Sequence, residues 1–276
     1  MSDFWGCLKL PKQNPIENMQ IMMYKHLLGV QKQTTNIGVL LELGKVSLHI
    51  NATKLAIKNW ERIKMGHSNE ILQSSYDEAE SENLNWISSI RECLEKNGLL
   101  DLFLNNYENK PPFIHLKIFQ SLSDQFHQNA FEKIRGENSK LRTYSTYKEK
   151  IGLETYLNLI KNPSVRTEIS KFRLSNHKLM IEIGRHKKIP RDLRFCRFCP
   201  NEVETEKHFL LHCSTYKEIR EKMITDAGLK NPCFRQYSKT QQFQYLLSNV
   251  EKHTSAYIIK AFEIREFLTK NPKILD

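Results

Sequence analysis

The stretch from residue 196 to residue 213 reads Cys196-Arg-Phe-Cys199-Pro-Asn-Glu-Val-Glu-Thr-Glu-Lys-His208-Phe-Leu-Leu-His212-Cys213, which has the pattern C-x2-C-x8-H-x4-C. A two-residue gap between cysteines lets one tight turn present two thiolates to the same ion, and a following helical turn can supply two more ligands. Four protein ligands are typical of a structural site, because catalysis needs an open position for water. Thiolate-rich ligation favours zinc over hard cations. The stretch therefore predicts a small zinc-binding module near residues 190–215, with Zn²⁺ as its cofactor.

Two histidines compete for the third ligand position of this module. His208 with Cys213 gives the pattern above, whereas His208 with His212 gives C-x2-C-x8-H-x3-H, which is also a legitimate zinc set. A thiolate is a better zinc ligand than an imidazole, which favours Cys213 over His212. This choice leaves His212 free to point outward. We therefore expect the ligands to be Cys196, Cys199, His208 and Cys213; the alternative is a chance cluster of buried cysteines, since free cysteines prefer interiors.

Cysteine usage and the N-terminus bear on the compartment. The chain has 276 residues and six cysteines, of which Cys7, Cys93 and Cys233 are scattered. Its N-terminus has no basic segment followed by an apolar stretch, so it does not resemble a signal peptide. No apolar run approaches the roughly 20 residues of a membrane-spanning helix, and no membrane partner is expected. These features predict an intracellular protein, nuclear or cytoplasmic and not secreted, with reduced thiols.

Apolar periodicity outside the cysteine stretch predicts an all-α protein, a helical array to which the zinc module is attached. Strand signals are thin. Caps such as Asn14-Pro15 and Asn162-Pro163, helix-ending glycines such as Gly29 and Gly44, and three-to-four spacing of apolar residues indicate the helices. The expected helices cover about 15–28, 36–43, 48–65, 83–97, 112–135, 153–161, 163–174, 205–227, 238–251 and 254–269.

Three segments organise this array. We expect a helical segment over 1–66, a helical connector over 83–150 and a basic zinc-binding helical module over 151–276. The polar stretch 67–83 is interpreted as a linker or as a helix exposed all round, and 137–150 as a loop or a short extended piece. Periodic methionines and leucines, including Ile16, Met19, Met22, Met23 and Leu27, are interpreted as core residues.

Positive charge is concentrated just before the cysteine stretch. The formal net charge of the chain is +11, which favours a polyanionic partner. Between residues 171 and 197 only Glu182 and Asp192 are acidic, whereas nine residues are cationic: Lys171, Arg173, Lys178, Arg185, Lys187, Lys188, Arg191, Arg194 and Arg197. On a shared face these side chains would neutralise several phosphates, so we expect them to bind RNA and/or DNA. The alternative is a solvated flank of the zinc module.

Sequence signals of an enzyme are missing. The glycines are isolated, so there is no phosphate-cradling loop, and neither G-x-S-x-G nor H-E-x-x-H occurs. Adjacent aspartates, which could form the two-metal clamp of a polymerase, do not occur either. We therefore expect a protein that is not an enzyme.

Several stretches together resemble the C-terminal region of non-LTR (LINE-type) retrotransposon reverse transcriptases. Residues 14–30, Glu42-Leu43-Gly44 and Trp60 are similar to the region just past the palm of those enzymes. Residues 171–179, beginning Lys-Phe-Arg-Leu-Ser-Asn-His, resemble the segment that leads into their cysteine-histidine motif. The match continues through Ile189-Pro190-Arg191 and the stretch 196–213. The resemblance spans nearly the whole chain and is most specific over 171–213.

This resemblance implies a thumb-like helical N-terminal part followed by a zinc-bearing module that contacts nucleic acid. It also implies that Cys196, Cys199, His208 and Cys213 are the ligands. The fingers and palm with their paired aspartates are absent, so the expected function is nucleic-acid binding without polymerase or nuclease activity, with a reverse transcriptase supplied in trans as a further partner. The alternative is a zinc-stabilised helical scaffold for protein contacts, or a non-functional fragment of a retroelement.

Overall fold

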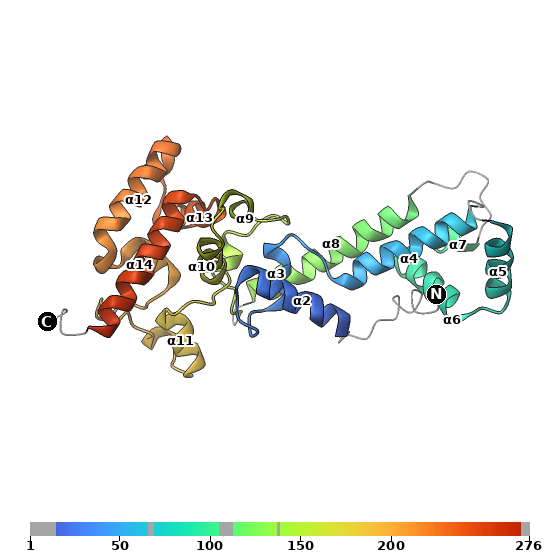
Figure 1. The fold of residues 1–276 in the computed structure, drawn as a ribbon, viewed down its shortest axis with the longest axis horizontal. Coiled ribbons are helices and arrows are strands. Elements are labelled where there is room, and N and C mark those ends of the chain that lie inside the picture. Colours follow the sequence, from blue (N-terminus) through green and yellow to red (C-terminus); the bar gives the residue numbers. More distant parts are fainter. Residues whose placement is uncertain (1–14, 66–68, 105–112, 137–138, 272–276) are drawn as a thin grey trace. The chain divides into compact units, whose positions relative to one another are not determined.

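The structure of the chain is a computed structural model, and it describes residues 15–65, 69–104, 113–136 and 139–271 (Figure 1). Over these residues the fold is an array of helices without a single strand, which confirms the all-α prediction. The extended pairing among them consists of two isolated bridges, Leu43 with Leu153 and Phe195 with Val203. None of the described helices combines the length and the apolar character needed to cross a membrane.

The chain divides into two compact units. The first unit comprises residues 1–21 and 46–130, and the second comprises residues 22–45 and 131–276. These units group the chain differently from the segments 1–66, 83–150 and 151–276 expected from the sequence. Residues 22–45 belong with the C-terminal part because the buried side chain of Glu42 pairs with Arg173, a contact that a reading along the chain cannot reveal.

The first unit contains the helices α4 Leu48–Lys64, α5 Glu70–Ser81, α6 Asn85–Lys96 and α7 Asp101–Leu104, most of α8 Ile114–Arg135, and the start of α2 Pro15–Leu28. Their apolar faces form one buried cluster that includes Trp60, Ile90 and Ile118. The Trp60 ring stacks on Phe103 with 5.9 Å between the ring centroids, and its indole N–H donates to the Tyr76 hydroxyl. Burial of these large side chains stabilises the unit by roughly 1.5–3 kcal/mol each.

One buried carboxylate serves the start of α8. Glu61 on α4 accepts hydrogen bonds from the backbone N–H groups of Phe113 (2.8 Å), Ile114 (3.2 Å) and His115 (3.3 Å). These donors have no partner within the helix, and a negative charge at a helix N-terminus is also favoured by the helix dipole. Glu61 thus caps a helix that lies more than fifty residues further along the chain.

The polar stretch 67–83 corrects one expectation. Within it lies helix α5, which begins after Asn69, whose side chain accepts a hydrogen bond from the Leu72 N–H. The helix is neither a linker nor exposed all round, because Tyr76 and Ala79 are buried in the core of the first unit. Most of its other residues are polar and the apolar Ile71 is exposed, so the two buried positions were hidden in the sequence pattern.

The second unit contains the remaining helices. The α-helices are α3 Asn36–Glu42, α9 Thr155–Leu159, α10 Pro163–Arg173, α11 Met180–His186, α12 Lys217–Lys230, α13 Lys239–Ser248 and α14 Lys252–Lys270. Short turns join them: the 3-10 turns η2 Tyr144–Thr146, η3 Arg191–Leu193, η5 Ser214–Tyr216 and η6 Pro232–Gln236, and the π-helical turn η4 His208–His212. Both α10 and α12 pack against α14. Helix α2 Pro15–Leu28 contributes residues to both units.

Two helix boundaries in the second unit differ from expectation. The basic segment before the cysteines contains α11, which the sequence did not indicate because its seven residues are too few to show a clear period. The helix expected over 205–227 is interrupted at Cys213, where η4 ends and a 3-10 turn leads into α12. The loop expected over 137–150 is confirmed for residues 139–150, which contain only the turn η2.

Glycines end two helices as the sequence predicts. Gly29 (φ +65°) follows α2, and Gly44 (φ +60°) lies two residues beyond α3. In each case the following N–H bonds back five residues, from Val30 to the Lys25 carbonyl and from Lys45 to the Leu40 carbonyl. This is the Schellman arrangement, whose left-handed residue is most easily glycine. The predicted cap Asn14 lies outside the described residues.

The interpretation of the α2 residues as core is wrong. Five large apolar side chains of this helix are all more than half exposed: Ile16, Met19, Met22, Met23 and Leu27. The opposite face of the helix, with Ile21 and Leu28, is the one that is buried. Apolar spacing shows which residues share a face, but it cannot choose between two apolar faces of one helix.

A buried network of charges joins three elements of the second unit. The Arg173 guanidinium on α10 pairs with Glu42 (2.6 Å) and with Glu154 (2.6 Å), and it also donates to the Leu247 carbonyl at the end of α13. Lys148 pairs with Glu154 and donates to the Gly152 carbonyl. Two cations and two anions therefore balance in the interior, which is the condition under which buried charge is tolerated.

Candidate metal centre

A tight hairpin positions the first two cysteines. The isolated bridge between Phe195 and Val203 brings its two arms together, and the Cys196 N–H donates to the Glu202 carbonyl at 2.7 Å. The chain reverses between the arms, where the Glu202 N–H donates to the Cys199 carbonyl at 3.3 Å. This turn presents both thiols on one side, as the C-x2-C spacing predicts.

A single π-helical turn positions the other two side chains. In η4 the Cys213 N–H donates to the His208 carbonyl at 2.8 Å, which is the i to i+5 bond of a π-helix. On an α-helix two residues five positions apart lie about 140° apart around the axis, so their side chains diverge. The π turn brings His208 and Cys213 to the same side, and the x4 spacing therefore suits this turn rather than an α-helix.

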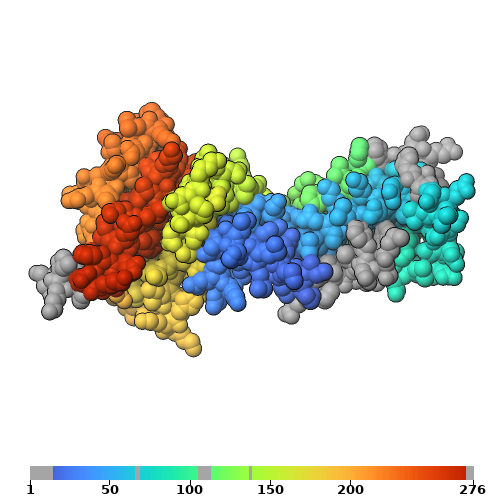
Figure 2. Space-filling view, in the orientation of Figure 1, coloured from blue at the N-terminus to red at the C-terminus, as the bar shows by residue number. Residues whose placement is uncertain are grey.

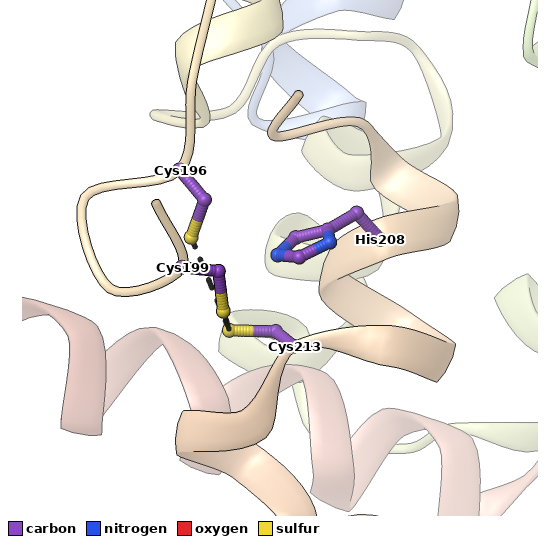
Figure 3. A group of neighbouring side chains, drawn as sticks. All are labelled: Cys196, Cys199, His208 and Cys213. Carbon is purple, nitrogen blue, oxygen red and sulfur yellow. Dashed lines mark hydrogen bonds between the residues drawn. The ribbon is translucent and has the colours of Figure 1, made fainter. Parts of the chain in front are cut away.

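The four side chains converge on one point (Figure 3). Their ligand atoms all lie within 4.8 Å of one another, with 3.6 Å between the sulfurs of Cys199 and Cys213 and 4.0 Å between those of Cys196 and Cys213. These separations are far longer than the roughly 2.05 Å of a disulfide, and all three thiols are free. Cys196, His208 and Cys213 are buried, and Cys199 is half-buried. The group could hold one metal ion.

His208 supplies independent support for a ligand at this point. Both of its ring nitrogens are buried without a hydrogen-bond partner, and a carboxylate oxygen of Glu202 is 4.0 Å from Nδ1. A buried ring nitrogen without a partner is costly unless an ion or a donor meets it. His212, the alternative ligand, is exposed and lies outside the cluster, so the structure favours His208.

A hydrogen bond between two thiols of the cluster shifts their pKa values in opposite directions. A hydrogen bond with Cys213, together with burial, raises the pKa of Cys196 to about 12. The same hydrogen bond lowers the pKa of Cys213, against the effect of burial. Metal ligation requires thiolates, so an ion that binds here must displace the protons that these groups carry.

Acidic residues between the ligand pairs attach the cluster to the rest of the unit. Glu204 pairs with Arg265 of α14 (2.6 Å) and accepts from the Met180 N–H at the start of α11 (2.6 Å). Glu206 accepts from the Thr143 hydroxyl and lies 3.3 Å from the His177 ring. Burial alone would raise the pKa of Glu206, but the hydrogen bond and charge of His177 lower it to about 2. Both carboxylates are buried and fix the hairpin to three other segments.

The structure divides the nine predicted nucleic-acid-binding residues. Five of them are exposed: Lys178, Lys187, Lys188, Arg191 and Arg197. Three more are half-buried, and each has a partner within the chain. Lys171 pairs with Glu168, Arg185 pairs with Glu182, and Arg194 donates to the Ile181 and Ile189 carbonyls.

Arg173 does not belong to the exposed set. Its side chain is 1% exposed and belongs to the charge network with Glu42 and Glu154. Its prediction as a phosphate ligand is therefore wrong. Helical spacing could have indicated that Arg173 is buried. It follows Ile169 by four residues, so the two side chains share one face of α10, and Ile169 is buried.

Two cations that the sequence analysis missed lie close to this basic segment. Arg142 is 3.7 Å from Glu182. Lys140 lies near the same carboxylate, and burial together with the charge of Arg185 lowers the pKa of Lys140 against the effect of Glu182. Burial and the charges of Arg142, Arg185 and Arg191 likewise lower the pKa of Arg194. Lys140 and Arg142 come from a loop some forty positions before Glu182. No sequence motif links them to the basic segment.

Comparison with known proteins adds no assignment, since no family model matches the chain and neither a curated protein nor a solved structure is detectably similar to it.

Proposed function

We propose that the cluster of Cys196, Cys199, His208 and Cys213 is a structural zinc site. A tetrahedral zinc ion with Zn–S bonds of about 2.3 Å would hold its sulfurs about 3.8 Å apart, and the separations of 3.6 and 4.0 Å lie on either side of that value. Three thiols and one imidazole are a soft donor set that suits zinc better than calcium or magnesium. Four ligands fill the tetrahedron, so the ion would stabilise the fold rather than activate water.

The second part of the proposal is that the zinc-bearing unit binds nucleic acid through its phosphates. One observation carries it: five exposed cations, Lys178, Lys187, Lys188, Arg191 and Arg197, lie on or beside the hairpin and α11, which the metal cluster and Glu204 hold in place. The segment that contains α11 lies open on the surface, in the yellow region of Figure 2. Cations fixed on a rigid support lose less side-chain freedom on binding, which strengthens phosphate contacts.

The resemblance to LINE-type reverse transcriptases supports the same role. In those proteins the corresponding region follows the catalytic palm, whose paired aspartates this sequence lacks. We infer that the chain binds RNA or DNA without polymerase or nuclease activity of its own, and that a reverse transcriptase supplied in trans is a candidate partner. The metal cluster and the exposed cations support binding, and neither depends on the resemblance.

The test is binding of the full zinc-loaded chain to single-stranded RNA and to duplex DNA across a salt series. We expect affinity to fall steeply with salt, with a slope of about 0.9 per phosphate contacted on duplex DNA. Charge reversal at Lys187, Lys188 and Arg191 should weaken binding and flatten the slope. The matched control reverses three exposed cations of the first unit, Lys58, Arg62 and Arg91, and so changes net charge equally. If both variants lost affinity equally, binding would depend on net charge and not on the basic residues beside the metal cluster.

A second candidate function is a scaffold for protein contacts. The exposed Met22, Met23 and Leu27 of α2 favour it, because methionine-rich apolar surfaces are common where proteins bind partners. Absence of nucleic-acid binding at low salt, with zinc bound and the chain folded, would make this the better account.

A further inference from the structure

Three phenylalanines lie in or next to the metal cluster, and the structure separates them by exposure. Phe209 is fully buried and packs on Tyr216 and Tyr257. Phe198 lies edge-on to Tyr216, with Arg265 5.7 Å from its ring centroid. Phe195 is 39% exposed, and no other described ring or cation packs on it. One aromatic face at the hairpin is therefore available to a ligand.

Phe195 is exposed between two residues that contact the interior of the unit. Arg194 donates to the Ile181 carbonyl of α11 at 2.8 Å, and the Cys196 sulfur lies 4.0 Å from that of Cys213. The exposure of Phe195 therefore contrasts with the contacts of both its neighbours in the chain.

Backbone hydrogen bonds hold the segment that carries Phe195. On its two sides the Cys196 N–H donates to Glu202 (2.7 Å), and the Glu204 N–H donates to the Arg194 carbonyl (2.9 Å). The neighbouring Cys196 is a metal ligand, and its bond to the ion would fix the segment further. An aromatic ring on such a support loses little freedom when it binds, which favours affinity.

The charge next to the ring indicates the chemistry of its ligand. Arg197 is exposed two residues after Phe195, and the exposed Arg191 and half-exposed Leu193 precede it in the turn η3. An exposed aromatic face beside cations is the arrangement that binds single strands, where a base stacks on the ring and the phosphates meet the cations. A duplex hides its base faces in the stack and offers only their edges.

We propose that Phe195 stacks on an unpaired base and that the chain's nucleic-acid ligand is therefore single-stranded. This inference rests on the proposed nucleic-acid binding and deepens it, because phosphate contacts alone do not distinguish a single strand from a duplex. RNA and DNA share the chemistry, so the base face and not the sugar is what Phe195 recognises.

The experiment compares Phe195→Ala with Phe195→Trp in the full zinc-loaded chain, with Leu193→Ala as the matched control. Leu193 is an exposed apolar residue in the same surface segment and has no ring to stack. Binding is measured to a single-stranded RNA, to a single-stranded DNA and to a duplex DNA of the same sequence at one salt concentration. A fluorescent base analogue in the single strands reports stacking by quenching.

We expect Phe195→Ala to weaken single-strand binding by about 5- to 150-fold, the loss that corresponds to one base–aromatic stack, and to abolish quenching. Duplex binding should stay within twofold, Phe195→Trp should restore both readouts, and Leu193→Ala should change neither. Equal losses on single strands and duplex, or no loss on single strands, would overturn the stacking role while leaving nucleic-acid binding intact. Wild-type protein that binds no nucleic acid would instead overturn the proposed function itself. Zinc content, measured for every variant, must match the wild type.

Discussion

In the first unit Trp60, Ile90 and Ile118 belong to one continuous apolar cluster, whereas the interior of the second unit is crossed by charges and by the side chains of a candidate metal site. Arg173, Glu204 and Glu206 are all buried there, each with a partner from a distant segment. Apolar packing is non-directional and tolerates substitutions of similar volume. Buried charge pairs and metal-ligand sets do not tolerate substitution in this way, because removal of one member leaves the other buried and unsatisfied. The two units should therefore respond very differently to single changes.

Metal removal should produce the largest difference between the units. A strong chelator should unfold the hairpin and η4 and destabilise the second unit, because structural zinc sites contribute about 10–16 kcal/mol of binding free energy to folding. The first unit should keep its helices, because none of its described residues belongs to the cluster. Hydrogen exchange resolved by segment, together with circular dichroism, measures this.

Matched cysteine variants separate the metal effect from general thiol chemistry. Cys213→Ser should abolish stoichiometric metal binding, whereas Cys233→Ser, at an exposed cysteine outside the cluster, should not. His212→Ala should also bind metal normally. If the second unit stayed fully protected from hydrogen exchange without metal, the expected difference between the two units would be contradicted.

Replacement of Arg173 should have the next largest effect. Arg173→Met leaves Glu42 and Glu154 buried without their shared cation, and we expect a loss of about 3–5 kcal/mol in the free energy of unfolding of the second unit. Lys171→Met, at a half-buried residue of the same helix, should cost less than about 1 kcal/mol. Denaturant unfolding followed in each unit measures both. Similar losses in the two variants would show that the network adds little.

Glu61 sharpens the comparison, since it is a buried charge inside the apolar unit. Glu61→Ala leaves three N–H groups at the start of α8 without their acceptor, and we expect the free energy of unfolding of the first unit to fall by about 2 kcal/mol. The matched control is Glu92→Ala on the surface of α6, which should change stability by less than about 0.5 kcal/mol. Thermal unfolding of both variants tests this. A loss no larger than the control would mean that water replaces the cap.

A conservative change in the apolar cluster should have the smallest effect. Ile90→Val removes one methylene from a fully buried side chain and should cost about 1 kcal/mol. The unfolding midpoint of the first unit should fall, while metal affinity and the stability of the second unit should stay unchanged. A change in metal affinity would show that the units are coupled more strongly than their separate interiors suggest.

The sequence predicted the parts of the fold that depend on local pattern. Helix-ending Gly29 and Gly44, the cap Asn162 and the four candidate ligands are all signals that lie within a few residues of the structure they specify. The preference for thiolate also selected the set with His208 and Cys213 over the set with His208 and His212, and the cluster in the structure is the former set. The metal identity and the bound nucleic acid stay predictions.

The parts that the sequence did not predict depend on contacts between distant residues. Arg173 is buried because Glu42 lies 131 positions before it, and a count of charges along the chain cannot detect such a partner. The break at Cys213 follows a π turn that brings His208 and Cys213, five positions apart, to the same side, although the intervening Phe209-Leu210-Leu211 resembles an ordinary helix. The exposed face of α2 shows the converse, since apolar periodicity does not guarantee burial.

The closeness of the four ligands along the chain has a consequence for the order of folding. Cys196 and Cys213 are 17 positions apart, so closing the metal-binding loop costs little chain entropy and can happen as soon as that segment leaves the ribosome. The pairing of Glu42 with Arg173 must instead close a loop of 131 residues. Contacts of such long range slow folding. We therefore expect metal capture to precede the docking of residues 22–45, so that an ordered hairpin exists before the interior around Arg173 is complete.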